Sequence, residues 1–270
     1  MKGCTGSIKG SVQSLFGILS KFSCSNPSMG SVLVSFIKIG KTVKGTFLER
    51  PNRFLAYVRI GDTVVPSFTP NPGRMRELLT PETEVLLKEV VKDERKTSYD
   101  LVGVVHDGQI ISIDARVPNK LILEALKNGE LDEFSEYDVI DSEHVYGHSR
   151  FDFLLSNKDG DCLLEVKSCT LVKDGVAMFP DAKTERGSKH LRELMRTKKE
   201  GYRASILFLI QRTDAHTFCP NDEADPQFGR ALREAAAEGV EVYVYCSEFV
   251  EDRIILKGRV KVDLDWNCVL

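Results

Sequence analysis

The chain has 270 residues, of which 42% are hydrophobic and 29% charged, and its formal net charge is −3. This is the composition of a soluble globular protein, and the length corresponds to one large domain or two ordinary ones. The sequence has no run of eighteen apolar residues, which argues against a membrane-spanning helix and a membrane partner. A net charge near zero neither favours nor excludes nucleic acid, because local patches matter more.

The seven cysteines are scattered and form no C-x-x-C pair. Such a pattern is typical of free thiols in a reducing compartment, so we expect a cytoplasmic protein.

Residues 1–36 are rich in Gly and Ser and are predicted to be a flexible N-terminal extension. A signal peptide is disfavoured because the apolar run "LFGIL" is short and no clean cleavage site follows it. A start at Met29 is the alternative explanation of this segment.

Residues 37–115 are predicted to form an all-β domain. Short alternating or apolar runs are separated by turn residues, which suggests a small barrel or sandwich, with an OB-fold as one option. The runs are "GTFLER", "RFLAYVRIG", "TVVPSFTP", "TEVLLKEVV", "SYDLVGVVH" and "QIISIDA".

One loop of this domain, "TPNPGRMRELL", has two prolines and a glycine that fix a rigid turn, followed by Arg74 and Arg76. The loop is either a structural turn or a phosphate-binding loop that uses Asn71, Gly73 and Arg74. Its two arginines are candidate DNA-binding residues.

Residues 116–270 are predicted to form an α/β domain. The order of elements implies a mixed central sheet with helices on its faces. We expect helices at 118–129, 184–200 and 226–237, and strands at 137–146, 150–156, 161–168, 204–210 and 240–245, followed by a terminal hairpin.

The most informative pattern is a predicted hairpin built from "SRFDFLLS", the turn signal "NKDG" and "CLLEVKS". If Asn157 pairs with Gly160, the antiparallel register places Asp152 directly opposite Glu165. Side chains alternate along a strand, so Lys167 lies on the same face as Glu165. Two opposed carboxylates repel unless a cation or a proton lies between them. We therefore predict a site here rather than a solvated hairpin with a surface salt bridge.

A carboxylate on one strand and E-x-K on the next is the arrangement of a metal-dependent nuclease. Carboxylates suit hard cations, so we expect Mg²⁺ or Mn²⁺ at Asp152 and Glu165. Such an ion activates water and neutralises phosphate charge, while Lys167 can hold the water or stabilise the transition state. These sites often draw another glutamate from a preceding helix. Glu124, the one acid in "LILEAL", is predicted as that catalytic and metal-binding residue, with Glu143 as the alternative.

The run from Arg53 to Tyr245 resembles the sugar fermentation stimulation protein A family. The resemblance is carried by "RPNRFLAYV", "PNPGRM", "VPNKLILEAL", "YGHSRFDFLL", "EVKSCTLVKDGVAMFPDAKTERGSKHLREL", "EGYRASILFLIQR" and "RALREAAAEGVEVYVY". It implies an OB-like domain over 37–115 and a PD-(D/E)xK nuclease-like domain over 116–270. It also implies a DNA-binding protein with a proposed role in regulating sugar metabolism.

At the matching positions, the nuclease signature falls on Asp152, Glu165 and Lys167, with Glu124 as the helix glutamate. The family usually has asparagine where this chain has Asp114, so no role is assigned at that position.

The segment that follows the E-x-K strand is basic. From Lys183 to Arg203 there are eight Lys or Arg against three Glu. Either this predicted helix is a solvated face with i,i+4 ion pairs, or it places phosphate contacts beside the metal. The candidate DNA-binding residues here are Arg186, Lys189, His190 and Arg196.

Two functions follow from these patterns. The first is a divalent-metal-dependent DNA endonuclease. The second is a non-catalytic DNA-binding regulator of sugar-metabolism genes built on a nuclease fold. Both have DNA as the partner, and the sequence leaves open whether the protein is a homodimer.

Overall fold

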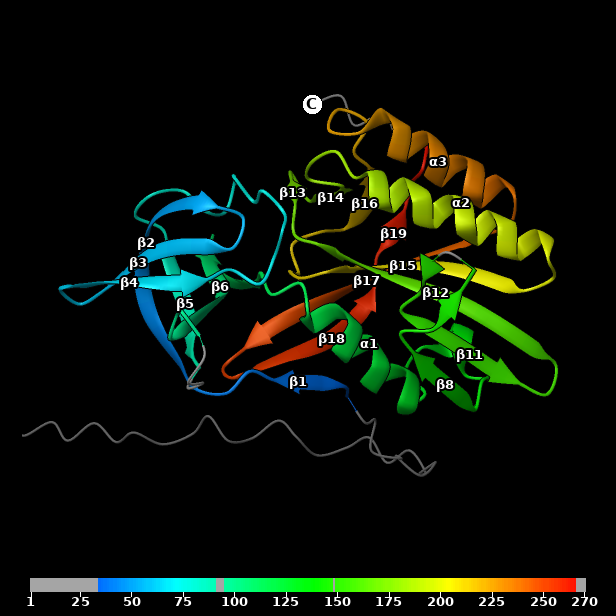
Figure 1. Cartoon of the computed structure of the whole chain (residues 1–270), viewed down its shortest axis with the longest axis horizontal. Coiled ribbons are helices and arrows are strands. Elements are labelled where there is room, and N and C mark those ends of the chain that lie inside the picture. The colour runs from blue at the N-terminus through cyan, green and yellow to red at the C-terminus, as the bar shows by residue number, and fades with distance from the viewer. Residues whose placement is uncertain (1–33, 91–94, 148, 266–270) are drawn as a thin grey trace, which may run out of the picture. The chain divides into compact units, whose positions relative to one another are not determined.

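Two groups of strands, each with its own core, make up the described part of the chain (Figure 1). The computed structural model describes residues 34–90, 95–147 and 149–265, so nearly all of the predicted N-terminal extension lies outside it. Among these residues, no helix is long and apolar enough to cross a membrane.

The first group is a closed five-stranded barrel. Its strands are β2 (Thr42–Asn52), β3 (Leu55–Ile60), β4 (Thr63–Phe68), β5 (Glu84–Glu89) and β6 (Tyr99–His106), and β7 (Gln109–Ser112) pairs with β6. Antiparallel pairing gives the order β4-β3-β2-β5-β6, and parallel pairing of β4 with β6 closes the barrel. This connectivity is that of an OB-fold, so the predicted OB-like barrel is confirmed.

The second group is a seven-stranded mixed sheet in the order β1-β18-β17-β15-β12-β11-β8. Three parallel strands form its centre, and their apolar runs are nearly continuous because both faces are covered. The strands are β1 (Phe36–Lys38), β8 (Val139–Ser142), β11 (Phe153–Asn157), β12 (Gly160–Cys169), β15 (Arg203–Ile210), β17 (Glu241–Val250) and β18 (Arg253–Arg259). Strand β1 thus belongs to this sheet, although it lies at the start of the segment assigned to the barrel.

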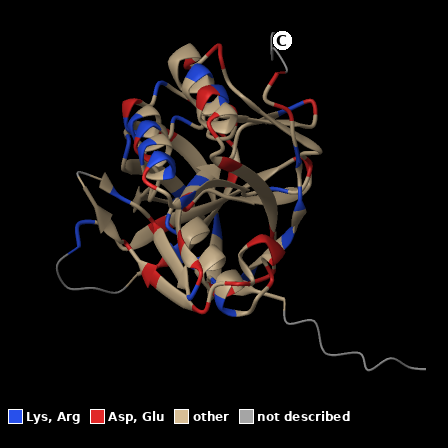
Figure 2. Cartoon of the chain, turned by 90° about the vertical axis from the view of Figure 1, so that its right-hand side faces the viewer, with Lys and Arg blue, Asp and Glu red and all other residues tan. Residues whose placement is uncertain are grey.

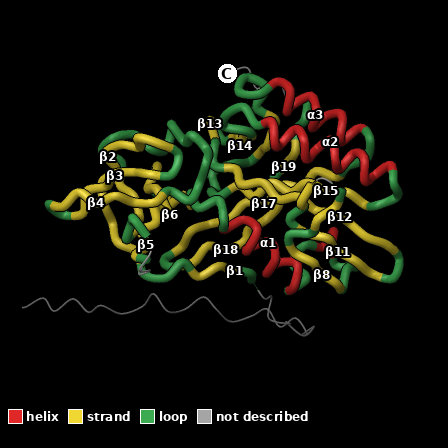
Figure 3. Tube along the Cα trace, viewed as in Figure 1, coloured by secondary structure: helices red, strands yellow, loops and turns green. Residues whose placement is uncertain are grey.

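Helix α1 (Val117–Lys127) covers one face of this sheet, and α2 (Glu185–Lys199) and α3 (Pro226–Ala237) cover the other (Figure 3). Each start has a local cause. Pro118 lies in the first turn of α1, and the Thr184 hydroxyl accepts the Gly187 N–H at 3.1 Å to cap α2. The predicted mixed α/β architecture is confirmed.

A small sheet escaped the sequence analysis. Among the described residues, β13 (Val172–Lys173), β14 (Val176–Phe179), β16 (Thr217–Pro220) and β19 (Lys261–Val262) pair in that order. Strand β14 leads directly into the Pro180–Asp181 segment beside the site described below. A two-stranded pair, β9 (Val145–Tyr146) and β10 (Ser149–Arg150), and a 3-10 turn η1 (Asp132–Phe134) complete the described elements.

The expectation of free thiols is met at Cys162, Cys169 and Cys246. It is wrong at Cys219, which is disulfide-bonded.

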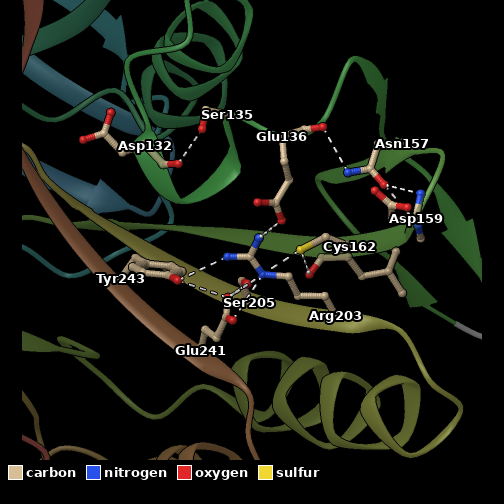
Figure 4. A network of polar contacts seen from close by, with 12 residues as sticks. Asp132, Ser135, Glu136, Asn157, Asp159, Cys162, Arg203, Ser205, Glu241 and Tyr243 are labelled. Atoms are coloured by element: carbon tan, nitrogen blue, oxygen red, sulfur yellow. Dashed lines mark hydrogen bonds and ion pairs between the residues drawn. The ribbon is translucent and has the colours of Figure 1, made fainter.

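One mostly buried cation joins β15 to its neighbours (Figure 4). The Arg203 Nε donates to both carboxylate oxygens of Glu241 at 3.1 and 2.9 Å, and its Nη1 donates to Glu136 at 2.8 Å. The guanidinium also lies 5.1 Å from the Phe134 ring centroid and donates to the Tyr243 hydroxyl at 3.3 Å. With a side chain only 20% exposed, Arg203 fixes the end of the sheet opposite to the site.

We expect Arg203→Ala to lower the free energy of unfolding by about 3 kcal/mol, because Glu241 loses its compensating charge in a partly buried position. Arg259→Ala is the matched control. Arg259 lies over the same Tyr243 ring at 5.1 Å but is exposed, so its loss should cost about 1 kcal/mol or less. Urea unfolding measures both, and equal losses would contradict the assigned role of Arg203.

Candidate functional site

The β11–β12 hairpin has the predicted register. Asn157 pairs with Gly160, and Phe153 pairs with Leu164. Asp152 lies one residue beyond the last of these pairs, opposite Glu165. The hairpin therefore brings the two carboxylates together at the edge of the parallel centre of the sheet.

Glu165 is a buried carboxylate on a central strand, with a side chain only 3% exposed. Its Oε1 accepts hydrogen bonds from Lys167 Nζ and from the ring of His190. Its Oε2 is buried and accepts no hydrogen bond within the described part of the chain. One oxygen is thus doubly compensated, and the other is available to a further positive group.

Asp152 is held by two neutral donors. Its Oδ2 accepts the backbone N–H of Val166 at 2.8 Å, and its Oδ1 accepts from the Asn119 side chain at 2.5 Å. Asn119 lies in the first turn of α1, and the sequence analysis did not single it out. These bonds orient the carboxylate and leave lone pairs on both of its oxygens for other partners.

The pKa values of Asp152 and Glu165 are shifted in opposite directions. Burial raises the pKa of Asp152 to about 6, and the negative charge of Glu165 adds to the shift. Burial would also raise the pKa of Glu165, but Lys167 and His190 outweigh it and hold that pKa below its usual value. A pair of this kind favours a bound cation.

The donor set fits a hard divalent ion that keeps several waters. Among the described residues, no cluster of three His, Cys, Asp or Glu side chains is arranged to hold a metal. The protein ligands would therefore be Asp152 and the free Oε2 of Glu165, and one or two carboxylates are what Mg²⁺ typically takes from a protein.

Glu124 does not join this pair, so its predicted role requires correction. Its side chain is 44% exposed and forms an ion pair with Lys127 at 3.2 Å. Asn119 faces Asp152, and Glu124 lies five positions further on, which at 100° per residue is a different side of the helix. Glu143, the alternative, is 60% exposed and pairs with Arg150.

His190 also requires correction, since it was predicted to contact DNA. Its side chain is only 6% exposed, and it packs against Glu165 instead of facing solvent. The Arg186 Nε donates to His190 Nε2 at 3.3 Å, so the proton on Nδ1 is the one that Glu165 accepts. The apolar residues of α2, such as Leu191 and Leu194, face inward, and His190 directly precedes Leu191. This position next to buried apolar residues is the sequence signal that was overlooked.

A cleft of about 1010 Å³ opens between the barrel and the larger sheet, and neither Asp152 nor Glu165 lines it. Two of its lining residues connect it to the site. Ser168 follows Lys167 on β12, and Arg186 donates to His190. Exposed cations from both groups of strands face this cleft: Arg53, Arg74, Arg76, Lys183 and Arg186.

The proline-rich loop is a structural turn that connects the two groups. Arg50 donates to the carbonyl oxygens of Asn71 and Gly73, each at 2.7 Å, and Asn71 binds the Ile113 carbonyl at 2.9 Å. The backbone N–H of Arg74 donates to the Asp181 carboxylate at 2.6 Å. The backbone N–H groups of Gly73, Arg74 and Met75 thus donate to the protein itself, whereas the Arg74 and Arg76 side chains are exposed.

The basic helix α2 has six Lys or Arg and two Glu, so blue predominates over red among its charged residues (Figure 2). All six cations except Lys198 are exposed. Arg196, a candidate for DNA contact, is engaged in ion pairs with Glu193 at 3.6 Å and Glu200 at 3.1 Å. Lys189 is exposed. Of the predicted DNA-binding residues, the cleft therefore gathers Arg74, Arg76 and Arg186.

Asp114 has a structural role. It forms an ion pair with Arg116 at 2.6 Å, and Arg116 also reaches Asp100 at 2.8 Å.

These features define a class: an OB barrel followed by a mixed-sheet α/β domain that carries a pair of carboxylates, Asp152 and Glu165, in its sheet. Family models agree. The SfsA N-terminal OB domain matches residues 48–113, and the sugar fermentation stimulation protein RE domain matches residues 116–253. The chain belongs to the sugar fermentation stimulation protein (SfsA) family.

Relatives match over nearly their whole length. A sugar fermentation stimulation protein homolog from Caldanaerobacter subterraneus subsp. tengcongensis is 50% identical over 222 residues, which is 82% of this chain and 97% of the relative. The homolog from Clostridium kluyveri is 48% identical over 223 residues, with the same shares. The structure of Pyrococcus furiosus SfsA in complex with Ca²⁺ matches with a TM-score of 0.79 and 29% identity, covering 85% of this chain and 99% of that one.

The raised pKa of Asp152 makes stability depend on pH in a metal-free buffer. Its folded-state pKa of about 6 exceeds its ordinary value of 3.8, so its contribution to stability is fully present below pH 3.8 and is lost as the pH rises to about 6. We expect the free energy of unfolding of the wild type to fall by about 2 kcal/mol relative to Asp152→Asn between pH 4 and pH 7.5. Urea unfolding with EDTA at both pH values measures this, and parallel pH profiles would contradict it.

Proposed function

We propose that this protein binds DNA and cleaves it with a divalent metal ion held by Asp152 and Glu165. The observation that carries the proposal is the buried Glu165 carboxylate, whose Oε2 has no hydrogen-bond donor among the described residues, opposite Asp152 and two positions from Lys167. The matching Pyrococcus furiosus protein was solved in complex with Ca²⁺, a hard cation that takes oxygen ligands.

When bound, such an ion supplies positive charge at the scissile phosphate and acidifies a coordinated water. The protein's own groups keep the ligands in place. Asn119 and the Val166 N–H orient Asp152, and Lys167 and His190 hold Oε1 of Glu165, which leaves Oε2 without a donor among the described residues. Lys167 is 15% exposed, and its ammonium can donate a hydrogen bond to the attacking water or to a phosphate oxygen.

The cleft supports DNA as the substrate. Its cations come from the barrel, from the loop and from the start of α2, so a phosphate backbone that lies in it contacts both groups of strands. Such contacts position the backbone without reading sequence. We therefore propose that the cleft aligns DNA across the acid pair.

A DNA-binding regulator that does not cleave is the second candidate. The observation that favours it is the ion pair between Lys167 and Glu165, which occupies the ammonium in the absence of substrate. The two candidates differ in turnover and not in DNA affinity.

Lys167→Ala separates the two. We expect it to lower Mn²⁺-dependent or Mg²⁺-dependent cleavage of duplex, branched or single-stranded DNA at least 100-fold, because a transition-state contact is lost. The affinity of the Lys167→Ala variant for Mn²⁺ should stay the same or increase, since a competing cation is removed. Asp152→Asn should instead weaken Mn²⁺ binding more than tenfold, because a metal ligand is lost.

Calorimetry and gel-based cleavage give the two readouts, and Glu124→Gln is the matched control that should leave both unchanged. A wild type that binds DNA but cuts none of these substrates with either metal would identify the regulator.

Charge in the cleft is tested by the salt dependence of DNA binding. Arg74→Ala combined with Arg76→Ala should lower duplex affinity and flatten the slope of log K against log salt by about 2, one unit for each phosphate contact. Lys41→Ala combined with Lys158→Ala removes two exposed cations outside the cleft and should leave the slope unchanged. Equal slopes for the two double variants would show that the cleft does not contact phosphates.

A further inference from the structure

A second hollow, of about 630 Å³, lies on the barrel itself. It is built by the turn between β2 and β3, the end of β4 and the segment that precedes β6. Oligonucleotides bind OB-folds on the face of the second and third barrel strands, between the loops after the first and fourth strands. In this barrel the hollow is lined from the matching places by β3, β4, the β2–β3 turn and the described residues Arg95–Thr97 that precede β6.

Two aromatic rings form the floor of this hollow, and we call Phe54 and Phe68 the aromatic platform. Their rings are nearly parallel, with an interplanar angle of 14° and centroids 6.0 Å apart. Phe54 is 50% exposed. The guanidinium of Arg95 lies 5.5 Å from the Phe68 centroid, and Asp100 holds it there at 2.5 Å.

The platform is fixed before any ligand arrives. Asn52 Oδ1 accepts the backbone N–H groups of Phe54 at 2.9 Å and Leu55 at 3.1 Å, which closes the turn. The Thr69 N–H donates to the Phe54 carbonyl oxygen at 3.0 Å. A rigid exposed ring loses little conformational entropy when a flat ligand stacks on it.

The residues that line the hollow suit a ligand with flat apolar faces and negative charge. They include Arg95, Lys96 and Arg116, and no acidic residue lines it within the described segments. Asp100 pairs with both arginines, so the exposed Lys96 is the cation available to a phosphate.

The hollow and the cleft adjoin at the β2–β3 turn. Asn52 lines both, Arg53 lines the cleft, and the next residue, Phe54, lines the hollow. A chain of nucleotides can therefore pass from the aromatic platform over this turn into the basic cleft.

We infer that the aromatic platform binds an unpaired stretch of single-stranded DNA by base stacking on Phe54. In a duplex the faces of the bases are covered by their neighbours, so an exposed ring can stack only on unpaired bases, whereas the phosphates of either form can reach Lys96. DNA with a single-stranded segment is then the substrate class of the proposed function. This inference rests on the proposed function for the cleavage step.

The test is fluorescence anisotropy with a labelled oligothymidine and a labelled duplex in metal-free buffer. Stacking on an aromatic side chain contributes about 1–3 kcal/mol per base, so Phe54→Ala should weaken oligothymidine binding about tenfold. Duplex affinity should stay unchanged, and so should the salt slope for oligothymidine, because no charge is removed. Phe54→Trp should retain or tighten binding, and Phe54→Leu should weaken it although it stays apolar.

Phe36→Ala is the matched control. Phe36 is 44% exposed and has the Arg253 guanidinium 4.9 Å from its ring centroid, but it lies on β1 and lines neither hollow. Thermal unfolding of each variant checks that the fold is retained, which half-exposed positions should allow.

Each adverse outcome has one meaning. Wild-type affinity in Phe54→Ala, or an equal loss in Phe36→Ala, would overturn the inference. Binding of duplex without oligothymidine would overturn it as well and leave the proposed function standing. A wild type that binds neither form would overturn both.

Discussion

The site depends on how the chain compensates a carboxylate buried in the middle of a sheet. Removing an ionised group from water costs several kcal/mol unless charges and hydrogen bonds replace the lost hydration. In Glu165, Oε1 accepts hydrogen bonds from Lys167 and His190, which replace its lost hydration. Oε2 accepts no hydrogen bond from the described residues. The negative charge of Glu165 contributes to the raised pKa of Asp152, so the two carboxylates repel each other and favour a cation near them. The remaining polar groups of the site, including Asn119, act by holding these two side chains where this repulsion persists.

Local patterns predicted the acid pair because its geometry is local. A hairpin with a strong turn signal has a register set by its turn, and strand alternation does the rest, so Asp152, Glu165 and Lys167 followed from a short stretch of sequence. The barrel and the mixed sheet were predicted for a similar reason, because the periodicity of each strand and the turn residues between strands are local features of the sequence. The resemblance to a family added the order of the domains.

What the sequence analysis missed depends on contacts between distant segments. Glu124 was chosen because a lone acid stood out in an apolar helix, but the rotation of α1 against the hairpin, which only packing decides, presents Asn119 instead. His190 was grouped with its basic neighbours, although its position beside the apolar stripe of α2 buries it. The pairing of Phe54 with Phe68 is set by the barrel register, and the small β13–β19 sheet joins strands that are too short to show any period.

The Asp181 contact limits how freely the two halves of this protein can be exchanged. Its carboxylate is bound by the backbone N–H of Arg74 from the loop of the barrel, at a point where a side chain on Gly73 would come within 2.9 Å of both Asp181 and Asn71. A chimera whose OB barrel has no matching loop would therefore leave this carboxylate, which lines the cleft, without the N–H groups that bind it. The two halves are modular in fold but matched at this joint, so any successful graft has to transplant the loop together with the aspartate that it binds.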